Sequence, residues 1–198
     1  IYNYYKEQGW KYQQYIACLD PLGEDRGKTP YALNPEQYGM FLTELFNLWY
    51  EDWKKGEQPY IRQFENYIGI LLGYQPESCE QRGSCGTQNV VEADGSVYPC
   101  DFYALDEYKL GNFNCNRLEE IDKKRKEIAF VEQSQIVAEN CKNCKFYKIC
   151  KGGCRRNKDF NAMNGEYENY FCKSYRIFFD ICLERMIQIV EIIKNQKG

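Results

Sequence analysis

Hydrophobic and polar residues alternate along the first part of the chain in a way that predicts strands and helices in turn. Residues 11–19 and 60–64 form apolar runs of strand length, and apolar residues at helical spacing follow each run, over 34–56 and 65–72. Asn34 begins the longer helix, because this Asn cap is followed by Pro at the first helical position and an acid in the first turn. The order predicts parallel strands covered by helices. Since two strands are too few for a whole sheet, we expect this part to close a larger α/β domain.

The remainder of the chain combines a hairpin, loops and helices. Asp94-Gly95 lies between two alternating apolar runs, which predicts a β-hairpin. Residues 118–137 are charged and periodic and predict a helix, whereas 141–156 are rich in Lys, Cys and Gly and predict a loop. Apolar positions at helical spacing predict a long last helix over 174–194 that packs on the rest of the chain. The two parts together predict a fold of the α+β class.

Composition and charge narrow the function classes. The chain has 198 residues, of which 43% are apolar, and this is enough for one good-sized domain or two small ones. A net charge of -3 gives no support for binding to nucleic acid or an anionic membrane, and no apolar run is long enough to span a membrane. No signal peptide is recognisable, so we expect a cytoplasmic protein. Because the chain starts at Ile1 and not at Met, we also expect it to be part of a longer protein.

Cysteine is the residue type with the clearest chemical meaning in this sequence. The chain has 11 cysteines and no histidine, so any metal must bind thiolates or carboxylates. The odd number and the missing secretion signal argue against a framework made of disulfides alone. Short spacings instead let successive turns of the backbone direct several sulfurs at one point, as metal sites require. Eight cysteines form this framework: Cys79, Cys85, Cys100, Cys141, Cys144, Cys150, Cys154 and Cys172.

Iron–sulfur clusters, zinc and disulfides are the three candidate uses of this framework. Only one C-x2-C pair is present, at Cys141 and Cys144, whereas structural zinc ribbons usually combine two. Thiolate-only ligation suits iron–sulfur clusters, which we therefore favour, with two sites of four cysteines each. Spacing alone would add Cys150 and Cys154 to the C-x2-C pair as one site. The remaining cysteines are expected to be ordinary small buried residues: Cys18, Cys115 and Cys182.

The order of the eight cysteines resembles that of the SPASM domain, the cysteine-rich C-terminal extension of certain radical S-adenosylmethionine enzymes. The pattern is C-x5-C-x14-C followed by C-x2-C-x5-C-x3-C-x17-C. Three segments resemble anaerobic sulfatase-maturing enzymes: VEADGSVYPCDFY (91–103), LGN (110–112) and CKNCKFYKICKGGCRR (141–156). The segment IACLDPL (16–22) resembles the last barrel strands of the same family. The resemblance covers essentially the whole chain.

This resemblance implies a domain organisation and a reaction. Residues 1–75 would be the C-terminal end of a partial (β/α) radical S-adenosylmethionine barrel, 76–173 the SPASM domain, and 174–198 a C-terminal helix that packs on the body. Such enzymes oxidise a Cys or Ser of a sulfatase to Cα-formylglycine. A sulfatase polypeptide is therefore the implied partner, with a flavodoxin or ferredoxin as the candidate electron carrier.

One motif of that family is absent from the sequence. A [4Fe–4S] cluster on a C-x3-C-x2-C motif cleaves S-adenosylmethionine and yields the radical that takes a hydrogen atom from the substrate. Cys150 and Cys154 have the first spacing, but Arg155-Arg156-Asn157 follows them and no cysteine does. We therefore expect the motif upstream of Ile1, and expect this chain alone not to catalyse the reaction.

Individual residues also take roles from the resemblance. It implies two auxiliary [4Fe–4S] clusters with interlaced ligands, the first on Cys79, Cys85, Cys100 and Cys154, and the second on Cys141, Cys144, Cys150 and Cys172. Asp101 matches the position of a proposed general base, and Leu19 matches a position that contacts S-adenosylmethionine. Two other functions stay open. One is a SPASM enzyme that forms a crosslink in a peptide, and the other is a non-catalytic electron-transfer or zinc-binding module.

Overall fold

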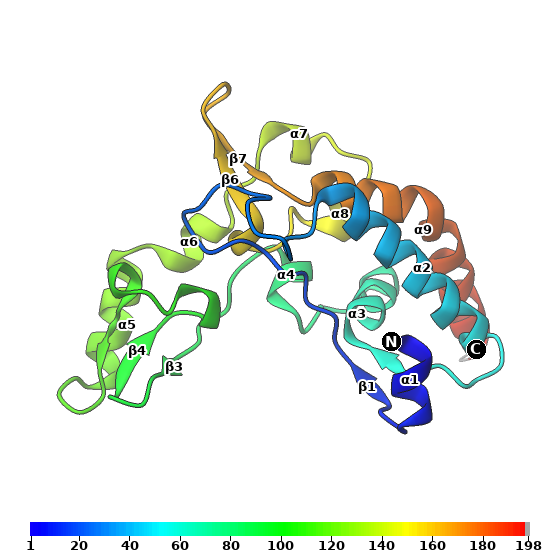
Figure 1. Ribbon diagram of the computed structural model, residues 1–198, viewed down its shortest axis with the longest axis horizontal. Coiled ribbons are helices and arrows are strands. Elements are labelled where there is room, and N and C mark those ends of the chain that lie inside the picture. The colour runs from blue at the N-terminus through cyan, green and yellow to red at the C-terminus, as the bar shows by residue number, and fades with distance from the viewer. Residues whose placement is uncertain (197–198) are drawn as a thin grey trace.

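The chain folds into an arch with two arms, and the computed structural model describes residues 1–196 (Figure 1). One arm holds three helices, α2 (Pro35–Trp53), α3 (Arg62–Leu71) and α9 (Cys172–Asn195). The other arm holds the strands β3 (Val90–Val91) and β4 (Ser96–Tyr98) beside α5 (Leu118–Glu127). The cysteine-rich segments lie between the arms, at the top of the arch.

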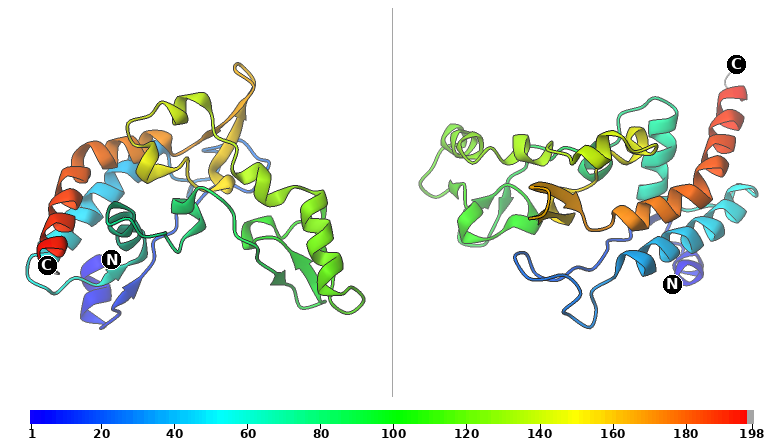
Figure 2. Two further views of the ribbon diagram at one scale, coloured as in Figure 1. Left: turned by 180° about the vertical axis from the view of Figure 1, so that it is seen from behind. Right: turned by 90° about the horizontal axis from the view of Figure 1, so that it is seen from above.

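The helical arm forms because the predicted apolar faces of its helices pack together. α2 begins where the sequence indicates, since the Asn34 side chain accepts a hydrogen bond from the Gln37 N–H at 2.8 Å. α9 lies beside α2 along most of its length (Figures 1 and 2). Phe46 of α2 and Phe178 of α9 are completely buried, with ring centres 6.0 Å apart. This packing gives the arm one continuous aromatic core and confirms both long helices.

The strands predicted in the first part are present but much shorter than expected. β1 (Tyr12–Gln13) and β2 (Tyr60–Ile61) pair in parallel, with Tyr12 opposite Tyr60, as the order of elements predicts. The predicted extension of the strand over 11–19 is wrong. β2 ends at Ile61, because α3 begins at the next residue. In the described part of the chain, residues 14–19 therefore have no strand with which to pair. An unpredicted short helix, α1 (Tyr2–Glu7), precedes β1.

The predicted hairpin is confirmed, and a third strand joins it. β3 and β4 are antiparallel, and β5 (Gly111–Asn112) adds to the other edge of β4. Gly95 has a φ of 85°, which favours glycine, and the Asp94 carboxylate accepts a hydrogen bond from the Ser96 N–H at 2.9 Å. Val97 of β4 packs with Leu110 and Ile121 in a small separate core. This core holds α5 against the sheet.

The helix predicted over 118–137 is wrong in its length. It divides into α5 and α6 (Phe130–Ser134), because Ala129 adopts the left-handed conformation with a φ of 47°. The break turns the chain so that the Phe130 ring meets the edge of Tyr103, with ring centres 5.1 Å apart. Burial of Phe130 therefore decides the course of the chain here, and the charged periodicity does not.

The cysteine-rich segments are also more regular than predicted. The loop expected over 141–156 contains short helical elements. These elements are α7 (Glu139–Lys142), α8 (Tyr147–Cys150) and the 3-10 turn η3 (Arg155–Asn157). α4 (Cys79–Arg82) and the 3-10 turns η1 (Asp101–Tyr103) and η2 (Asp106–Tyr108) lie in the other cysteine-rich segment. A further hairpin, β6 (Lys158–Asn161) and β7 (Glu166–Asn169), was not predicted and projects from the top of the arch (Figure 1).

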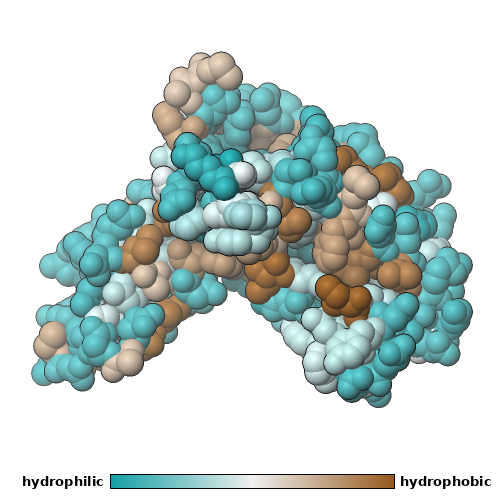
Figure 3. Space-filling view, viewed as in Figure 1, coloured by the Kyte–Doolittle hydropathy of each residue, from teal (hydrophilic) through white to brown (hydrophobic). Residues whose placement is uncertain are grey.

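The surface carries many hydrophobic side chains on the helical arm. In the view of Figure 3 they gather over α2, where Met40, Phe41 and Leu48 are exposed. Within residues 1–196, no helix is both long enough and apolar enough to cross a membrane. The division of the chain at 75 and 173 stays a prediction, and residues 197–198 of its last segment lie outside the described residues.

Candidate functional site

Four of the framework cysteines surround one cavity at the end of the helical arm. Its volume is about 500 Å³, and helices supply three of the four thiols. Cys141 comes from α7, Cys150 from the end of α8, and Cys172 from the first position of α9. The fourth thiol is Cys144, in the turn between α7 and α8. Phe146 and Phe179 add an apolar wall.

The thiols around this cavity influence one another's ionisation. The pKa of the Cys150 thiol is raised to about 12, mainly by burial and to a smaller extent by the charges of Cys172, Cys141 and Cys144. Cys172 likewise raises the pKa of Cys141, second to burial. Because their pKa values are raised, the Cys141, Cys150 and Cys172 thiols hold their protons more tightly than an isolated thiol does. A metal or cluster that bound them would displace those protons.

The other four framework cysteines, Cys79, Cys85, Cys100 and Cys154, form the first thiol group, and the four around this cavity form the second. Burial raises the pKa of the Cys154 thiol far above its ordinary value, and its smaller causes include the charges of Cys79 and Cys85. Burial raises the pKa of Cys100 to about 12, and Cys85 is among its smaller causes too. Cys154 therefore lies with cysteines distant in sequence. Gly152 and Gly153 direct it away from Cys150, because both adopt left-handed backbone conformations with φ of 83° and 72°.

The donor set of each group fits a cluster of several iron atoms. Each group offers four cysteine sulfurs, the ligand set of a [4Fe–4S] cluster. Among residues 1–196, no three Cys, Asp or Glu side chains lie close enough to hold a single metal ion, and all 11 cysteines are free thiols. In the second group the thiols surround a cavity, and a cluster suits such spacing because its four ligands bind four different iron atoms. Which thiols act as ligands stays a prediction.

A larger cavity, of about 660 Å³, brings together the other predicted site residues. Leu19, Asp101, Cys79 and Cys154 all line it, although they come from distant parts of the sequence. Asp101 is exposed at the start of η1, and its Oδ1 accepts a hydrogen bond from the Cys100 thiol at 3.1 Å. An iron-bound thiolate has no proton to donate. Binding of a cluster at Cys100 would therefore free this carboxylate oxygen to accept a proton from another molecule.

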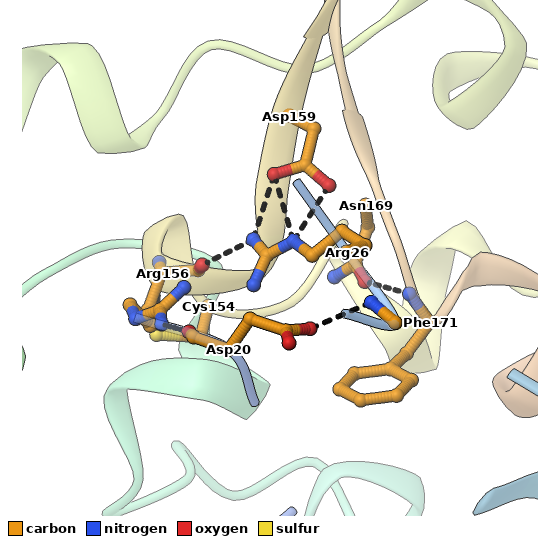
Figure 4. Close-up of polar contacts among 8 residues, drawn as sticks. Asp20, Arg26, Cys154, Arg156, Asp159, Asn169 and Phe171 are labelled. Atoms are coloured by element: carbon orange, nitrogen blue, oxygen red, sulfur yellow. Dashed lines mark hydrogen bonds and ion pairs between the residues drawn. The ribbon is translucent and has the colours of Figure 1, made fainter. Parts of the chain in front are cut away.

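An arginine network, which sequence reasoning missed, joins the Leu19 segment to Cys154 (Figure 4). Arg156 donates through its backbone N–H to the Cys154 sulfur at 3.4 Å, and through its guanidinium to the Asp20 carbonyl. Arg26 donates to the Arg156 carbonyl at 3.1 Å and to both oxygens of Asp159 at 2.7 to 3.1 Å. The one signal of this network in the sequence is the pair of arginines directly after Cys154. The residues around Arg26 contain no pattern that predicts its contact with Asp159, which lies more than a hundred residues later.

Asp20 is the anchor of the loop that carries Arg26. Its side chain is completely buried, which opposes ionisation. Hydrogen bonds from the Thr29 N–H, the Thr29 hydroxyl and the Gly27 N–H outweigh burial and lower the pKa of Asp20 to about 2. The carboxylate thus stays charged at any physiological pH and fixes the loop at the edge of the larger cavity.

The three cysteines outside the framework differ in their environments. Cys182 is completely buried in α9, as predicted. The prediction is wrong for Cys18 and Cys115, which are exposed. Cys18 lies in the extended segment that lines the larger cavity, and Cys115 lies in the turn after β5, so neither reaches a core.

Comparison with known proteins identifies the same domain and the same relatives as the cysteine order. Residues 79–145 match SPASM, an iron–sulfur cluster-binding domain. The chain is 45% identical over 194 residues to the cysteine-type anaerobic sulfatase-maturating enzyme of Clostridium perfringens (strain 13 / Type A), covering 98% of this chain and 52% of that protein. It is 29% identical over 215 residues to a serine-type enzyme of Bacteroides thetaiotaomicron, covering 100% and 51%. The chain thus spans about half the length of these relatives.

Solved structures agree with the sequence comparison. Native anSMEcpe with bound AdoMet and Kp18Cys peptide has a TM-score of 0.88 at 43% identity, and the match covers 96% of this chain and 52% of that chain. Native anSMEcpe with bound AdoMet and Cp18Cys peptide has the same TM-score at 44% identity, covering 97% and 53%. The resemblance predicted from the cysteines is confirmed: in sequence and in fold, the chain is similar to the C-terminal half of the anaerobic sulfatase-maturating enzymes, and its residues 79–145 match the SPASM iron–sulfur cluster-binding domain.

Proposed function

We propose that this chain is the auxiliary-cluster and substrate-binding part of a radical S-adenosylmethionine enzyme that oxidises a Cys or Ser of a sulfatase polypeptide to Cα-formylglycine. The observation that supports this best is the larger cavity, where Asp101 and Leu19 meet beside Cys79 and Cys154. A substrate in this cavity would lie between the side that receives S-adenosylmethionine and the side that receives a cluster.

Two [4Fe–4S] clusters would occupy the two thiol groups. The first would bind Cys79, Cys85, Cys100 and Cys154, and the second Cys141, Cys144, Cys150 and Cys172. Wherever the charge of one cysteine raises the pKa of another, both cysteines belong to the same set. Interlaced ligation of this kind also occurs in two-cluster ferredoxins, where the fourth cysteine of one run binds the other cluster.

The residues of this chain would complete the oxidation after the radical step. When bound, S-adenosylmethionine and its own cluster supply the radical that removes a hydrogen atom from the substrate Cβ, and the auxiliary clusters supply an acceptor for one electron. Asp101 takes the proton of the substrate thiol or hydroxyl, with its Oδ1 freed from Cys100 as argued above. Loss of one hydrogen atom, one proton and one electron turns the side chain into a thioaldehyde or an aldehyde. Water then hydrolyses a thioaldehyde to the aldehyde, and the sulfur leaves as hydrogen sulfide.

The first 75 residues would be the end of a partial (β/α) barrel. Their parallel β1–β2 pair and the covering helix α2 are the elements that such a barrel repeats. Tyr12 and Tyr60 are exposed although they stack on each other across this pair, which suits a strand edge that further barrel strands cover.

An electron carrier of the flavodoxin or ferredoxin class would take the electron from the auxiliary clusters.

The role of Asp101 can be tested in the full-length enzyme by Asp101→Asn. Asparagine cannot accept the proton, so we expect formylglycine formation to fall on the order of a hundredfold or more, while cleavage of S-adenosylmethionine continues. Asp106→Asn is the matched control, because Asp106 is an exposed acid on the same arm outside the cavity. Product yield by peptide mass spectrometry and 5′-deoxyadenosine by chromatography measure the two steps. Undiminished product in Asp101→Asn would refute the base assignment.

Metal analysis separates this function from a zinc-binding module. Full-length protein purified without oxygen should be brown, and its auxiliary sites should add about eight iron and eight sulfide per chain. The control is a variant with Cys79, Cys85, Cys141 and Cys144 all changed to Ala, in which this iron should be missing. About two zinc ions per chain in place of this additional iron and sulfide would refute the cluster assignment.

A further inference from the structure

One segment of backbone, outside the cysteines themselves, contacts both thiol groups. It consists of α6 and the residues up to Ala138, and in Figure 1 it runs from α5 past the base of the β6–β7 hairpin to α7. In the middle of the segment, the Ser134 hydroxyl accepts a hydrogen bond from the Cys85 N–H at 2.8 Å. At its C-terminal end, the Ala138 carbonyl accepts one from the Cys141 N–H at 2.9 Å, and Ala138 lines the cavity of the second group. The segment therefore contacts one cysteine of each group.

Lys158 is bound to the middle of this segment. Its ammonium donates to the Ser134 carbonyl at 2.8 Å and to the Ile136 carbonyl at 2.9 Å. The Lys158 side chain is half-buried. Lys158 is the first residue of β6, which follows Cys154 closely in the sequence. The two carbonyls hold the positive charge between the cysteines of the first group and those of the second.

No carboxylate of the described residues forms a salt bridge with Lys158. Its neighbour Asp159 pairs with Arg26 instead. The groups that act on Lys158 through their charge are cysteines of both thiol groups and one arginine: burial lowers the pKa of its ammonium most, Cys141, Cys85 and Cys154 in their ionised form raise this pKa, and Arg155 lowers it. The charge of Lys158 is thus directed at both thiol groups and is not neutralised by a protein acid.

We propose that the positive charge of Lys158 stabilises the reduced state of both auxiliary clusters and so assists electron transfer to them. The inference rests on the proposed function, because it requires a cluster in each thiol group. A four-thiolate cluster is negatively charged and gains one more negative charge when it accepts an electron. A half-buried cation nearby stabilises the reduced form more than the oxidised form and so raises the reduction potential. A charge shared by both clusters keeps both able to receive the electron that leaves the substrate.

Lys158→Met tests the proposal, because Met keeps the length and apolar stem of the side chain without the charge. We expect the equilibrium constant for reducing each auxiliary cluster to fall on the order of tenfold, which is a shift of about 59 mV to lower potential for one electron. Lys158→Arg should restore both potentials towards the wild-type values. Lys148→Met is the matched control: Lys148 is exposed in α8, close to Cys150, so water screens its charge and both potentials should stay unchanged.

The readout is a redox titration of the anaerobically loaded full-length enzyme, followed by electron paramagnetic resonance. If Lys158→Met does not retain its clusters, Lys158→Gln provides the same comparison, since Gln is neutral and still offers a donor to the two carbonyls. Unchanged potentials, or a shift of one cluster alone, would overturn the proposal. A wild-type enzyme without two auxiliary cluster signals would instead refute the proposed function, so the two failures can be distinguished.

Discussion

At the scale of single residues, the separation of the two thiol groups depends on two glycines. Gly152 and Gly153 lie between Cys150 and Cys154 and both have positive φ. A backbone of this shape turns sharply, so the two cysteines face different groups although only three residues separate them. The Asn169 side chain fixes the turn from outside, because its amide donates to the Gly152 carbonyl at 2.9 Å. Here glycine is required by conformation and by space.

We therefore predict that Gly153→Ala is much more damaging than the same change at Gly165. Both glycines have a φ of 72°, which should cost about 1 kcal/mol in either alanine variant. At Gly153 the new methyl group would also collide with the Asn169 amide, whereas nothing lies within 4 Å at Gly165. We expect about 2–4 kcal/mol of lost stability for Gly153→Ala, together with lower iron content. Anaerobic urea unfolding and iron analysis measure both effects, and equal losses in the two variants would contradict this account.

The sequence could indicate which residues carry the chemistry, but less of how they are grouped. The eight cysteines stand out by spacing, and the turn at Asp94-Gly95 is encoded by its own two residues. Spacing alone, however, would place Cys154 with Cys150, and the structure places it with Cys79 and Cys85. The reason is physical: a local pattern reports the distance along the backbone, whereas the grouping depends on a turn that distant side chains such as Asn169 stabilise.

At the scale of elements, helices were predicted more accurately than strands. α2 and α9 are long, amphipathic and packed on each other, so their periodicity alone identifies them. The strands contain two to four residues each, which is too short for an alternating pattern to be distinctive. The β6–β7 hairpin was missed for a further reason. Its strand residues Phe160 and Tyr167 are exposed and pack mainly on each other, so no apolar face marks it in the sequence.

The Arg26 loop shows what element-level prediction leaves out. Residues 20–29 form no helix or strand, yet they join the segment that contains Leu19 to β6 through Asp159 and to η3 through Arg156. These contacts link parts of the chain that are far apart in sequence, and each one is polar. Hydrophobic periodicity contains no information about such bonds, so the connection between the two sides of the larger cavity became visible only in three dimensions (Figure 4).

At the scale of the whole molecule, the two thiol groups depend on each other because the chain passes between them repeatedly. It leaves the first group at Cys100, enters the second at Cys141, returns to the first at Cys154 and ends in the second at Cys172. The segment between Cys150 and Cys154 is thus held at both ends by different groups. If each group binds a cluster, as proposed, loss of one cluster should release one end of this segment and weaken the site to which the other end belongs.

We predict, accordingly, that Cys79→Ala removes more iron than one cluster contains. Cys79 belongs only to the first group, in α4, and contributes nothing directly to the cavity of the second. With the first cluster lost, Cys154 is free to move, and residues 141–150 should exchange their amide hydrogens faster. Cys115→Ala is the control, since Cys115 is exposed and outside both groups. Iron analysis and hydrogen exchange of the anaerobic full-length protein measure the effect. A complete second cluster and wild-type hydrogen exchange at 141–150 in Cys79→Ala would contradict this prediction. The two sites would then be independent, and the interlaced order of the cysteines would not affect the stability of either site.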